Sequence, residues 1–241
     1  MELGNDVRWK RMYRAAAVAA LLMIGLVLAD MGISMALPAG DVNPADLSAA
    51  DWLGRFDTAP LYALRDYGVF NICSIILGIP VLLSLYHIHR DTNQPLALLA
   101  VMVSVLGGGI YIANNTALPM LSLGHTYAAA ATEIERQTIE AAGAALLARG
   151  ADFTMGSLVG TLLPSLGNLL MAAAVLTGKV FKKAVGYVGM AAYLSLSVFT
   201  VMTVFWPGLF GIAMIVAMPG GLLVLVWNII LTCKFIKLSK I

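Results

Sequence analysis

The sequence predicts an all-α, polytopic membrane protein: a bundle of six transmembrane helices with both chain ends in the cytoplasm. Of the 241 residues 60% are apolar and only 12% are charged, which leaves too few charges to cover a water-facing surface. Apolar runs of about 20 residues, the length that a helix needs to cross the hydrocarbon layer, recur along the chain. Basic residues gather beside alternate connections between these runs. Together these observations predict a single integral membrane domain over residues 1–241.

Six apolar runs qualify as membrane spans. They are too long and too rich in Ala and Leu for strands, and in lipid every backbone amide must be paired within its own segment, so they must be helical. Trp206-Pro207-Gly208 predicts a tight turn between the last two, because proline disfavours helical geometry at the residue before it. The expected spans are 15–37, 68–86, 96–114, 155–177, 184–206 and 209–232.

The distribution of Lys and Arg predicts the orientation. Eleven of the fifteen precede the first run, lie between runs two and three or four and five, or follow run six. The positive-inside rule places these positions in the cytoplasm. We also expect the protein to lie in the plasma (inner) membrane of a prokaryote. His87 and His89 then fall in a short, solvated cytoplasmic loop. The formal charge of +2 is too weak to predict a nucleic-acid partner.

Two connections on the extracytoplasmic side are longer than simple turns. Residues 38–67 mix aspartates with Trp52, Leu53 and Phe56, which predicts short helices on the membrane interface or over the bundle. In residues 126–149 the apolar positions fall close to one helical face, which predicts an amphipathic helix.

Asp30 is the sharpest candidate for chemistry. It lies about 10 Å inside the outer end of the first span, where a charged acid costs roughly 2.5–3.5 kcal/mol, so it should face protein or water. Arg65 or Arg149 could reach it from the outer mouth. One interpretation is a proton-linked or cation-binding carboxylate in an outward-facing cavity. The other is an acid that only holds neighbouring helices together.

Several further polar residues lie in the apolar runs. They either hydrogen-bond helices to one another or form a polar pocket with Asp30 that opens outward. These ligand- or proton-binding candidates are Asn71, Tyr111, Asn114, Asn115 and Asn168.

Three prolines fall near the middle of spans two, four and six, namely Pro80, Pro164 and Pro219. Each removes a backbone hydrogen bond, so we expect kinks. Kinked helices at the bilayer midplane form substrate sites in transporters but are also ordinary in membrane proteins that transport nothing.

No catalytic, cofactor or metal motif is visible in the sequence, which leaves an enzymatic role uncertain and disfavoured. We therefore expect neither a cofactor nor a metal ion. The two cysteines do not form a CxxC pattern.

Two stretches carry a resemblance to a known family. They are the run from Asn71 through Ile88, and Gly178-Lys179-Val180-Phe181-Lys182-Lys183-Ala184-Val185-Gly186-Tyr187-Val188-Gly189. They resemble a broad bacterial family of six-span integral membrane proteins that is known only as a domain of unknown function. The resemblance implies a fold and no chemistry.

Three functions stay open on the sequence. The first is a multi-pass membrane protein that binds or transports a small solute or a proton through an outward-facing polar cavity. The second is a non-catalytic structural or assembly subunit, with a homo-oligomer or another membrane subunit as partner. The third is an intramembrane lipid-modifying enzyme. In each case the lipid bilayer is a partner.

Overall fold

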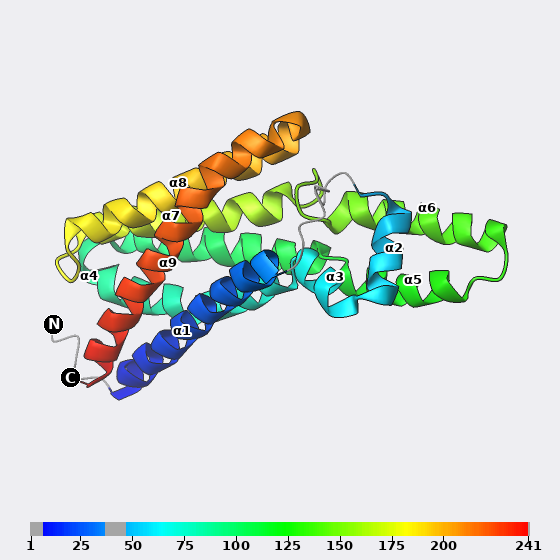
Figure 1. The fold of residues 1–241 in the computed structure, drawn as a ribbon. Coiled ribbons are helices and arrows are strands. Elements are labelled where there is room, and N and C mark those ends of the chain that lie inside the picture. The colour runs from blue at the N-terminus through cyan, green and yellow to red at the C-terminus, as the bar shows by residue number, and fades with distance from the viewer. Residues whose placement is uncertain (1–6, 37–46, 241) are drawn as a thin grey trace.

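The computed structural model describes residues 7–36 and 47–240, and the regular secondary structure of these residues is entirely helical (Figure 1). The elements in chain order are α1 (Val7–Ala36), α2 (Ala49–Thr58), α3 (Pro60–Asp66), α4 (Val69–Asn114), α5 (Ala117–Ala129), α6 (Glu133–Gly150), α7 (Leu158–Thr177), α8 (Lys183–Phe205), the 3-10 turn η2 (Pro207–Leu209) and α9 (Phe210–Lys240).

The long helices form a bundle with two different ends. At one end, α2, α3, α5 and α6 make a separate cluster, which we call the cap (Figure 1). At the opposite end α1 begins, α9 ends, and the chain turns from α7 to α8. This is the basic end, since it carries Lys179, Lys182 and Lys183 in the turn and Lys234 and Lys237 near the end of α9.

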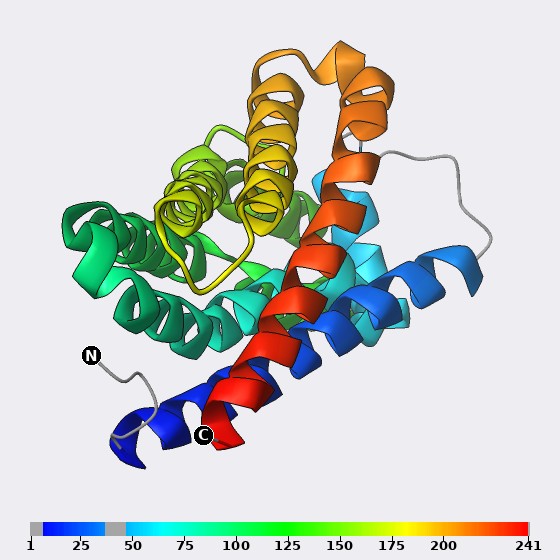
Figure 2. The ribbon, with the colours of Figure 1, turned by 90° about the vertical axis from the view of Figure 1, so that its left-hand side faces the viewer.

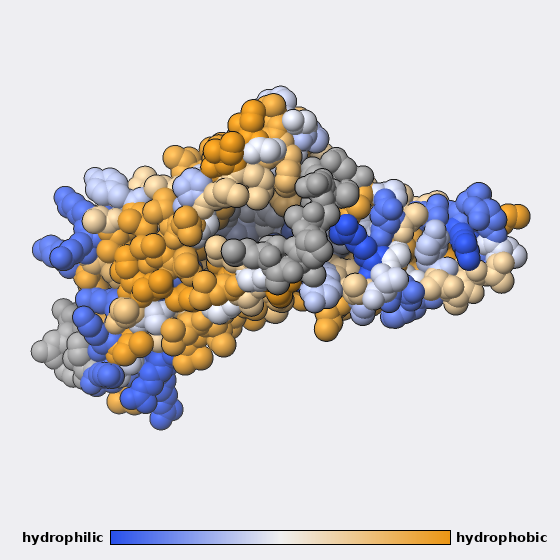
Figure 3. Space-filling model, in the orientation of Figure 1, coloured by the Kyte–Doolittle hydropathy of each residue, from blue (hydrophilic) through white to orange (hydrophobic). Residues whose placement is uncertain are grey.

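Five segments of the described chain are long and apolar enough to cross a membrane. They are Val7–Ile33, Val69–Ala129, Leu158–Thr177, Lys183–Phe205 and Pro207–Lys240. Between the two ends the surface is largely apolar, whereas hydrophilic residues gather at the ends (Figure 3). The prediction of a helical membrane protein is therefore confirmed.

The helix ends agree closely with the sequence prediction in the last third of the chain. The fifth run was expected over 184–206, and α8 spans Lys183–Phe205. Trp206 leaves the helical region with φ −133° and ψ 70°, and the chain turns through η2 into α9. The predicted turn at Trp206-Pro207-Gly208 is confirmed.

The connection between the second and third runs differs from the prediction. The helix continues through residues 87–92, and α4 consists of two helices joined at Asn93, whose φ of −153° and ψ of 66° are not helical. The Asn93 side chain accepts a hydrogen bond from the amide of Leu96 (3.4 Å), which caps the second helix. His87 and His89 are therefore buried in the helix, and the expected solvated loop at these histidines is wrong.

The bundle is a closed ring of helices. Each neighbouring pair in the order α1, α4, α7, α8, α9 and back to α1 is in contact. At the basic end the ring is filled by an apolar core that includes Tyr13, Ala16, Leu85, Trp227 and Phe235.

The cap has an apolar core of its own, which includes Trp52, Leu53, Phe56, Tyr67 and Met120. Both α2 and α6 begin with capping boxes, formed by Ser48 with Asp51 and by Thr132 with Glu135. The expected helices in residues 38–67 are thus present as α2 and α3, while the part of that prediction on residues 37–46 lies outside the described residues.

Pro80, Pro164 and Pro219 lie inside α4, α7 and α9, as expected. Each of these helices continues through its proline. The non-helical backbone within α4 is at Asn93 and not at Pro80.

Candidate functional site

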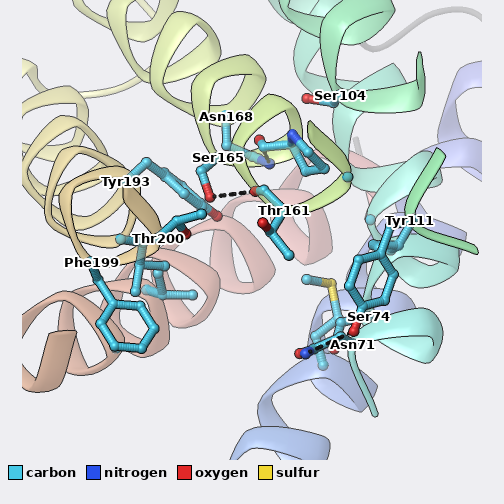
Figure 4. Close-up of a pocket in the computed structure, with 18 of the residues that line it drawn as sticks. Asn71, Ser74, Ser104, Tyr111, Thr161, Ser165, Asn168, Tyr193, Phe199 and Thr200 are labelled. Carbon is cyan, nitrogen blue, oxygen red and sulfur yellow. Dashed lines mark hydrogen bonds between the residues drawn. The ribbon is translucent and has the colours of Figure 1, made fainter. Parts of the chain in front are cut away.

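A cavity of about 540 Å³ lies inside the helix ring. This volume is within the range of small-molecule sites. Residues of α1, α4, α7, α8 and α9 line it, together with the connection between α6 and α7. Of the polar residues predicted from the sequence, Asp30, Asn71, Tyr111 and Asn168 all line this cavity. Figure 4 shows Asn71 and Tyr111 on α4 on one side and Asn168 on α7 on another.

The centre of the polar part is Asp152, in the connection between α6 and α7. Its Oδ1 accepts a hydrogen bond from the Tyr111 hydroxyl (2.9 Å), and its Oδ2 accepts one from the amide Nδ2 of Asn71 (3.1 Å). Asn71 and Tyr111 also meet each other at 3.3 Å, between Nδ2 and the hydroxyl oxygen. One carboxyl group thus joins three segments that are far apart in the sequence.

Two glycines make this arrangement possible. Gly68 has φ +84°, and a Cβ at this position would lie 2.1 Å from the Tyr111 hydroxyl and 2.9 Å from Oδ2 of Asp152. Only glycine fits both the backbone conformation and the space. On α7, a Cβ at Gly160 would lie 2.7 Å from the Cα of Tyr111, so glycine allows α7 to approach α4 at the level of the site.

The residue after Asp152 has a strained backbone. Phe153 has φ +67°, an uncommon value for a bulky residue. Its ring packs edge-on against Phe199 of α8 (5.7 Å between centroids) and Phe210 of α9 (5.5 Å). These ring contacts hold the connection against the far helices, and strain of this kind is often found at functional sites.

Burial and hydrogen bonding act in opposite directions on the pKa of Asp152. Burial raises the pKa of its carboxyl group above the ordinary value, against the hydrogen bonds from Tyr111 and Asn71, which lower it. Tyr67 lies nearby in the cap, and burial raises the pKa of its hydroxyl to about 12, so it stays neutral.

Asp30 occupies a different place at the edge of the cavity. Its Oδ1 accepts a hydrogen bond from Nε of Arg65 (2.7 Å), and its backbone oxygen accepts one from Nη2 (3.0 Å). Nη1 of Arg65 also donates to Oδ1 of Asp66 (2.6 Å). The other carboxyl oxygen of Asp66, Oδ2, lies 3.8 Å from Nη1 of Arg55. Of the two arginines expected to reach Asp30, the structure places Arg65 on it.

The amide of Asn168 is held by its own helix, since its Nδ2 donates to the Pro164 carbonyl (2.9 Å). Ser165 and Thr161 on the same helix also line the cavity, and their hydroxyls likewise donate to carbonyls of the preceding turn. Ser104 lines it as well, with a buried Oγ that has no hydrogen-bond partner among the described residues.

Asn114 and Asn115 are not among the residues that line the cavity. Asn114 donates to the Gly156 carbonyl (3.4 Å), and Asn115 donates to the Tyr67 carbonyl (2.9 Å). The Asn115 side chain also accepts a bond from the amide of Ala117 at the start of α5 (3.0 Å). Both amides hold the connection between the bundle and the cap.

A second, smaller cavity of about 160 Å³ lies on the cap side of the first. Residues of the cap line it, among them Trp52, Asp66 and Tyr67. Asp152 and Phe153 line both cavities. These two residues therefore form the boundary between a space in the cap and a space inside the helix ring.

Asp152 is the candidate site residue that sequence reasoning missed. It precedes the expected fourth span by only three residues, within Gly150-Ala151-Asp152-Phe153. Nothing in that spacing indicates that the chain folds the carboxyl group inward. Groups of three or more His, Cys, Asp or Glu that could hold a metal ion are absent from the described part of the chain.

One protein-family profile, described as Domain of unknown function (DUF4386), matches residues 18–234 of the chain. The matched region runs from α1 into α9 and contains every residue of the site. No curated protein and no solved structure matches the sequence. The match confirms the resemblance seen in the sequence and adds no activity to it. The chain belongs to the DUF4386 family, a domain of unknown function.

Proposed function

We propose that this protein binds a small solute or a proton in a cavity that is accessible from the extracytoplasmic side of a prokaryotic plasma membrane. Asp152 is the titrating group. The observation that carries the proposal is the position of Asp152, held by Tyr111 and Asn71 where the two cavities meet.

The proposal includes six crossings. With 46 residues, α4 would be about 69 Å long if straight, roughly twice the hydrocarbon thickness. Its break at Asn93 divides it into two helices, each long enough for one crossing. With the other four apolar segments this gives six, which agrees with the expectation from the sequence.

The orientation follows from charge. The basic end carries most of the Lys and Arg residues, which favours the cytoplasm for that end and for both termini. The cap, the smaller cavity and Asp152 are then extracytoplasmic. The apolar core at the basic end closes the ring toward the cytoplasm, which supports binding from outside more directly than passage through the membrane.

The experiment compares the wild-type protein with Asp152→Asn across pH. Because burial raises the pKa of Asp152, the folded protein holds this proton more tightly than the unfolded chain. The resulting stabilisation is full below the ordinary pKa of 3.8 and is lost as the pH rises through the raised value. We expect the wild-type melting temperature in detergent, followed by tryptophan fluorescence, to fall across that window relative to Asp152→Asn.

Glu133→Gln is the matched control, because it removes an exposed carboxyl group in the cap that bonds the neutral Gln137, and it should retain the wild-type pH dependence. Parallel curves for wild type and Asp152→Asn would contradict a proton site at Asp152. That result would favour the alternative of an assembly subunit, in which the polar residues only hold helices together.

A further inference from the structure

The cavity has an opening on the side of the bundle. In α1, the buried residues Tyr13, Ala16 and Ala20 lie toward the basic end, and no residue from Leu21 to Ile33 is buried. Figure 2 shows α1 and α9 crossing near the basic end and separating toward the cap. Figure 3 shows a hollow on this face, and the described residues along its rim are largely apolar.

Both sides of this opening contribute to the lining. Met23, Val27 and Asp30 of α1 line the cavity, as do Gly221 and Val224 of α9. In the proposed orientation, the opening between these helices faces the outer leaflet of the bilayer. A molecule dissolved in that leaflet can therefore enter from the side without crossing the cap.

The charges of the lining have one sign. Among the described residues that line the cavity, Asp30 and Asp152 are charged types, and there is no Lys or Arg. Asp30 is engaged by Arg65. The hydrogen bonds of Asp152 come from two neutral groups, Tyr111 and Asn71, so its negative charge is not balanced by an ion pair in the described structure.

The rest of the lining is mostly apolar and aromatic. Near Asp152 it includes Phe153 and Phe199, and farther toward the basic end it includes Leu82 and Trp227. Aromatic faces attract cations, and aliphatic side chains accept an alkyl chain. Neutral polar side chains, among them Ser165, Asn168 and Asn228, also lie along this wall.

We propose that the cavity takes an amphiphilic cation, an alkyl chain with an ammonium head, which enters from the outer leaflet between α1 and α9. This inference rests on the proposed function and names the class of its ligand. The ammonium head lies against the Asp152 carboxylate and the Phe153 ring. The alkyl chain extends along the apolar wall toward Trp227. A neutral or anionic head would lack the attraction between an ammonium group and the Asp152 carboxylate.

The test uses the full chain in phosphatidylcholine nanodiscs near neutral pH. The probe is an alkyltrimethylammonium with bromine on its chain, because bromine quenches tryptophan fluorescence on close contact. Trp227 lines the cavity and is 2% exposed, so a chain in the lipid alone does not reach it. We expect saturable quenching by the cation, and no such quenching in Trp227→Phe or by the matched bromoalkyl alcohol.

Two pairs of variants test where the amphiphile binds. A side chain added at Gly221 meets nothing within 4 Å and fills the cavity, whereas Gly211 on the same helix is equally open and lies outside the lining. Gly221→Leu should abolish the saturable quenching, and Gly211→Leu should keep it. Asp152→Asn should weaken it on the order of tenfold or more, since a charge-assisted contact is lost, and Glu133→Gln should not.

Each result separates this inference from the proposed function. If the alcohol quenches as well as the cation, and only Gly221→Leu removes the effect, the cationic class is wrong while a cavity site stands. If quenching is unsaturable and the same in Gly221→Leu, the amphiphile is wrong, and the pH experiment alone decides on the proton site. If Asp152→Asn does not fold, Gly221→Leu and the alcohol still decide the inference.

Discussion

The two halves of the helix ring are held together in different ways. Toward the basic end, α1 lies against its neighbours through Ala16, Ala20 and Tyr13, all fully buried, and apolar contacts fill the centre. Toward the cap, no residue of α1 from Leu21 to Ile33 is buried, and the centre is a cavity bordered by Asp152, Asn71 and Tyr111. One bundle therefore has a sealed half and an open half.

The difference shows how small residues set the width of a membrane bundle. Alanine lets helix backbones approach closely, and without a hydrophobic driving force in lipid that contact is a main source of association. Where α1 changes to Leu21 and Leu22, both exposed, close contact ends. In the open half, Gly160 maintains contact between α4 and α7, while α1 and α9 separate.

The largest expected effect comes from a substitution that disrupts the contact between α4 and α7 in the open half. In Gly160→Leu the new Cβ would lie 2.7 Å from the Cα of Tyr111, and backbone cannot move aside as a flexible side chain can. We expect a loss of about 3 kcal/mol of stability, at the upper end for overpacked cores. The measurement is the melting temperature and the yield of monodisperse protein in detergent.

Gly109→Leu on α4 is the control for that substitution, since a Cβ there meets nothing within 4 Å. Its melting temperature should stay near that of the wild type. Equal behaviour of the two variants would show that α4 and α7 are not in close contact at Gly160.

The second prediction concerns the sealed half. The hydroxyl of Tyr13 and Nδ1 of His87 are 2.8 Å apart in a buried hydrogen bond between α1 and α4, and Trp9 stacks on His87 at 3.7 Å. Tyr13→Phe removes the bond and leaves the ring in place. We expect a loss of about 2 kcal/mol, because a buried polar atom loses a partner.

Tyr187→Phe is the matched control, because Tyr187 is 61% exposed on α8. It should change the melting temperature little. If Tyr13→Phe and Tyr187→Phe have the same melting temperature, packing alone holds α1 to α4 in this half.

The architecture was predictable because the bilayer imposes it. Each run such as 184–206 must satisfy its own backbone and match the membrane thickness, so its composition alone marks it. The connection at residues 87–95 was harder, because helix propensity continues past the apolar run. Only the capping side chain of Asn93 with Pro95 two residues later marks where the second helix begins.

The site was predictable only in part. Asn71, Tyr111 and Asn168 are conspicuous because polar side chains are costly in apolar runs. Asp152 is not conspicuous, since aspartate is common in connections, and its position depends on the conformations of Gly68 and Phe153. Two arginines, Arg65 and Arg149, could reach Asp30 on the sequence, and the structure pairs Arg65 with it.

The smallest expected effect is the salt dependence of the ion pair between Arg65 and Asp30 in the open half, compared with the buried Tyr13 hydrogen bond in the sealed half. Arg65 links α3 to α1 through Asp30, whose side chain is half exposed, whereas the Tyr13 bond is fully buried. Ions screen exposed charges over about 8 Å at physiological ionic strength but hardly affect a neutral buried contact. The Arg65 side chain itself is 13% exposed, so Arg65→Gln should cost about 1 kcal/mol at low salt, the upper end for surface pairs, and less at high salt.

The loss caused by Tyr13→Phe should be the same at both salt concentrations. Arg136→Gln, which removes an exposed cation from the cap, controls for the change in net charge. A salt-independent loss in Arg65→Gln would mean that the link between α1 and α3 is shielded from the solvent. The open half would then be closed at its outer edge, and access to the cavity would depend on the separation of α1 from α9 alone.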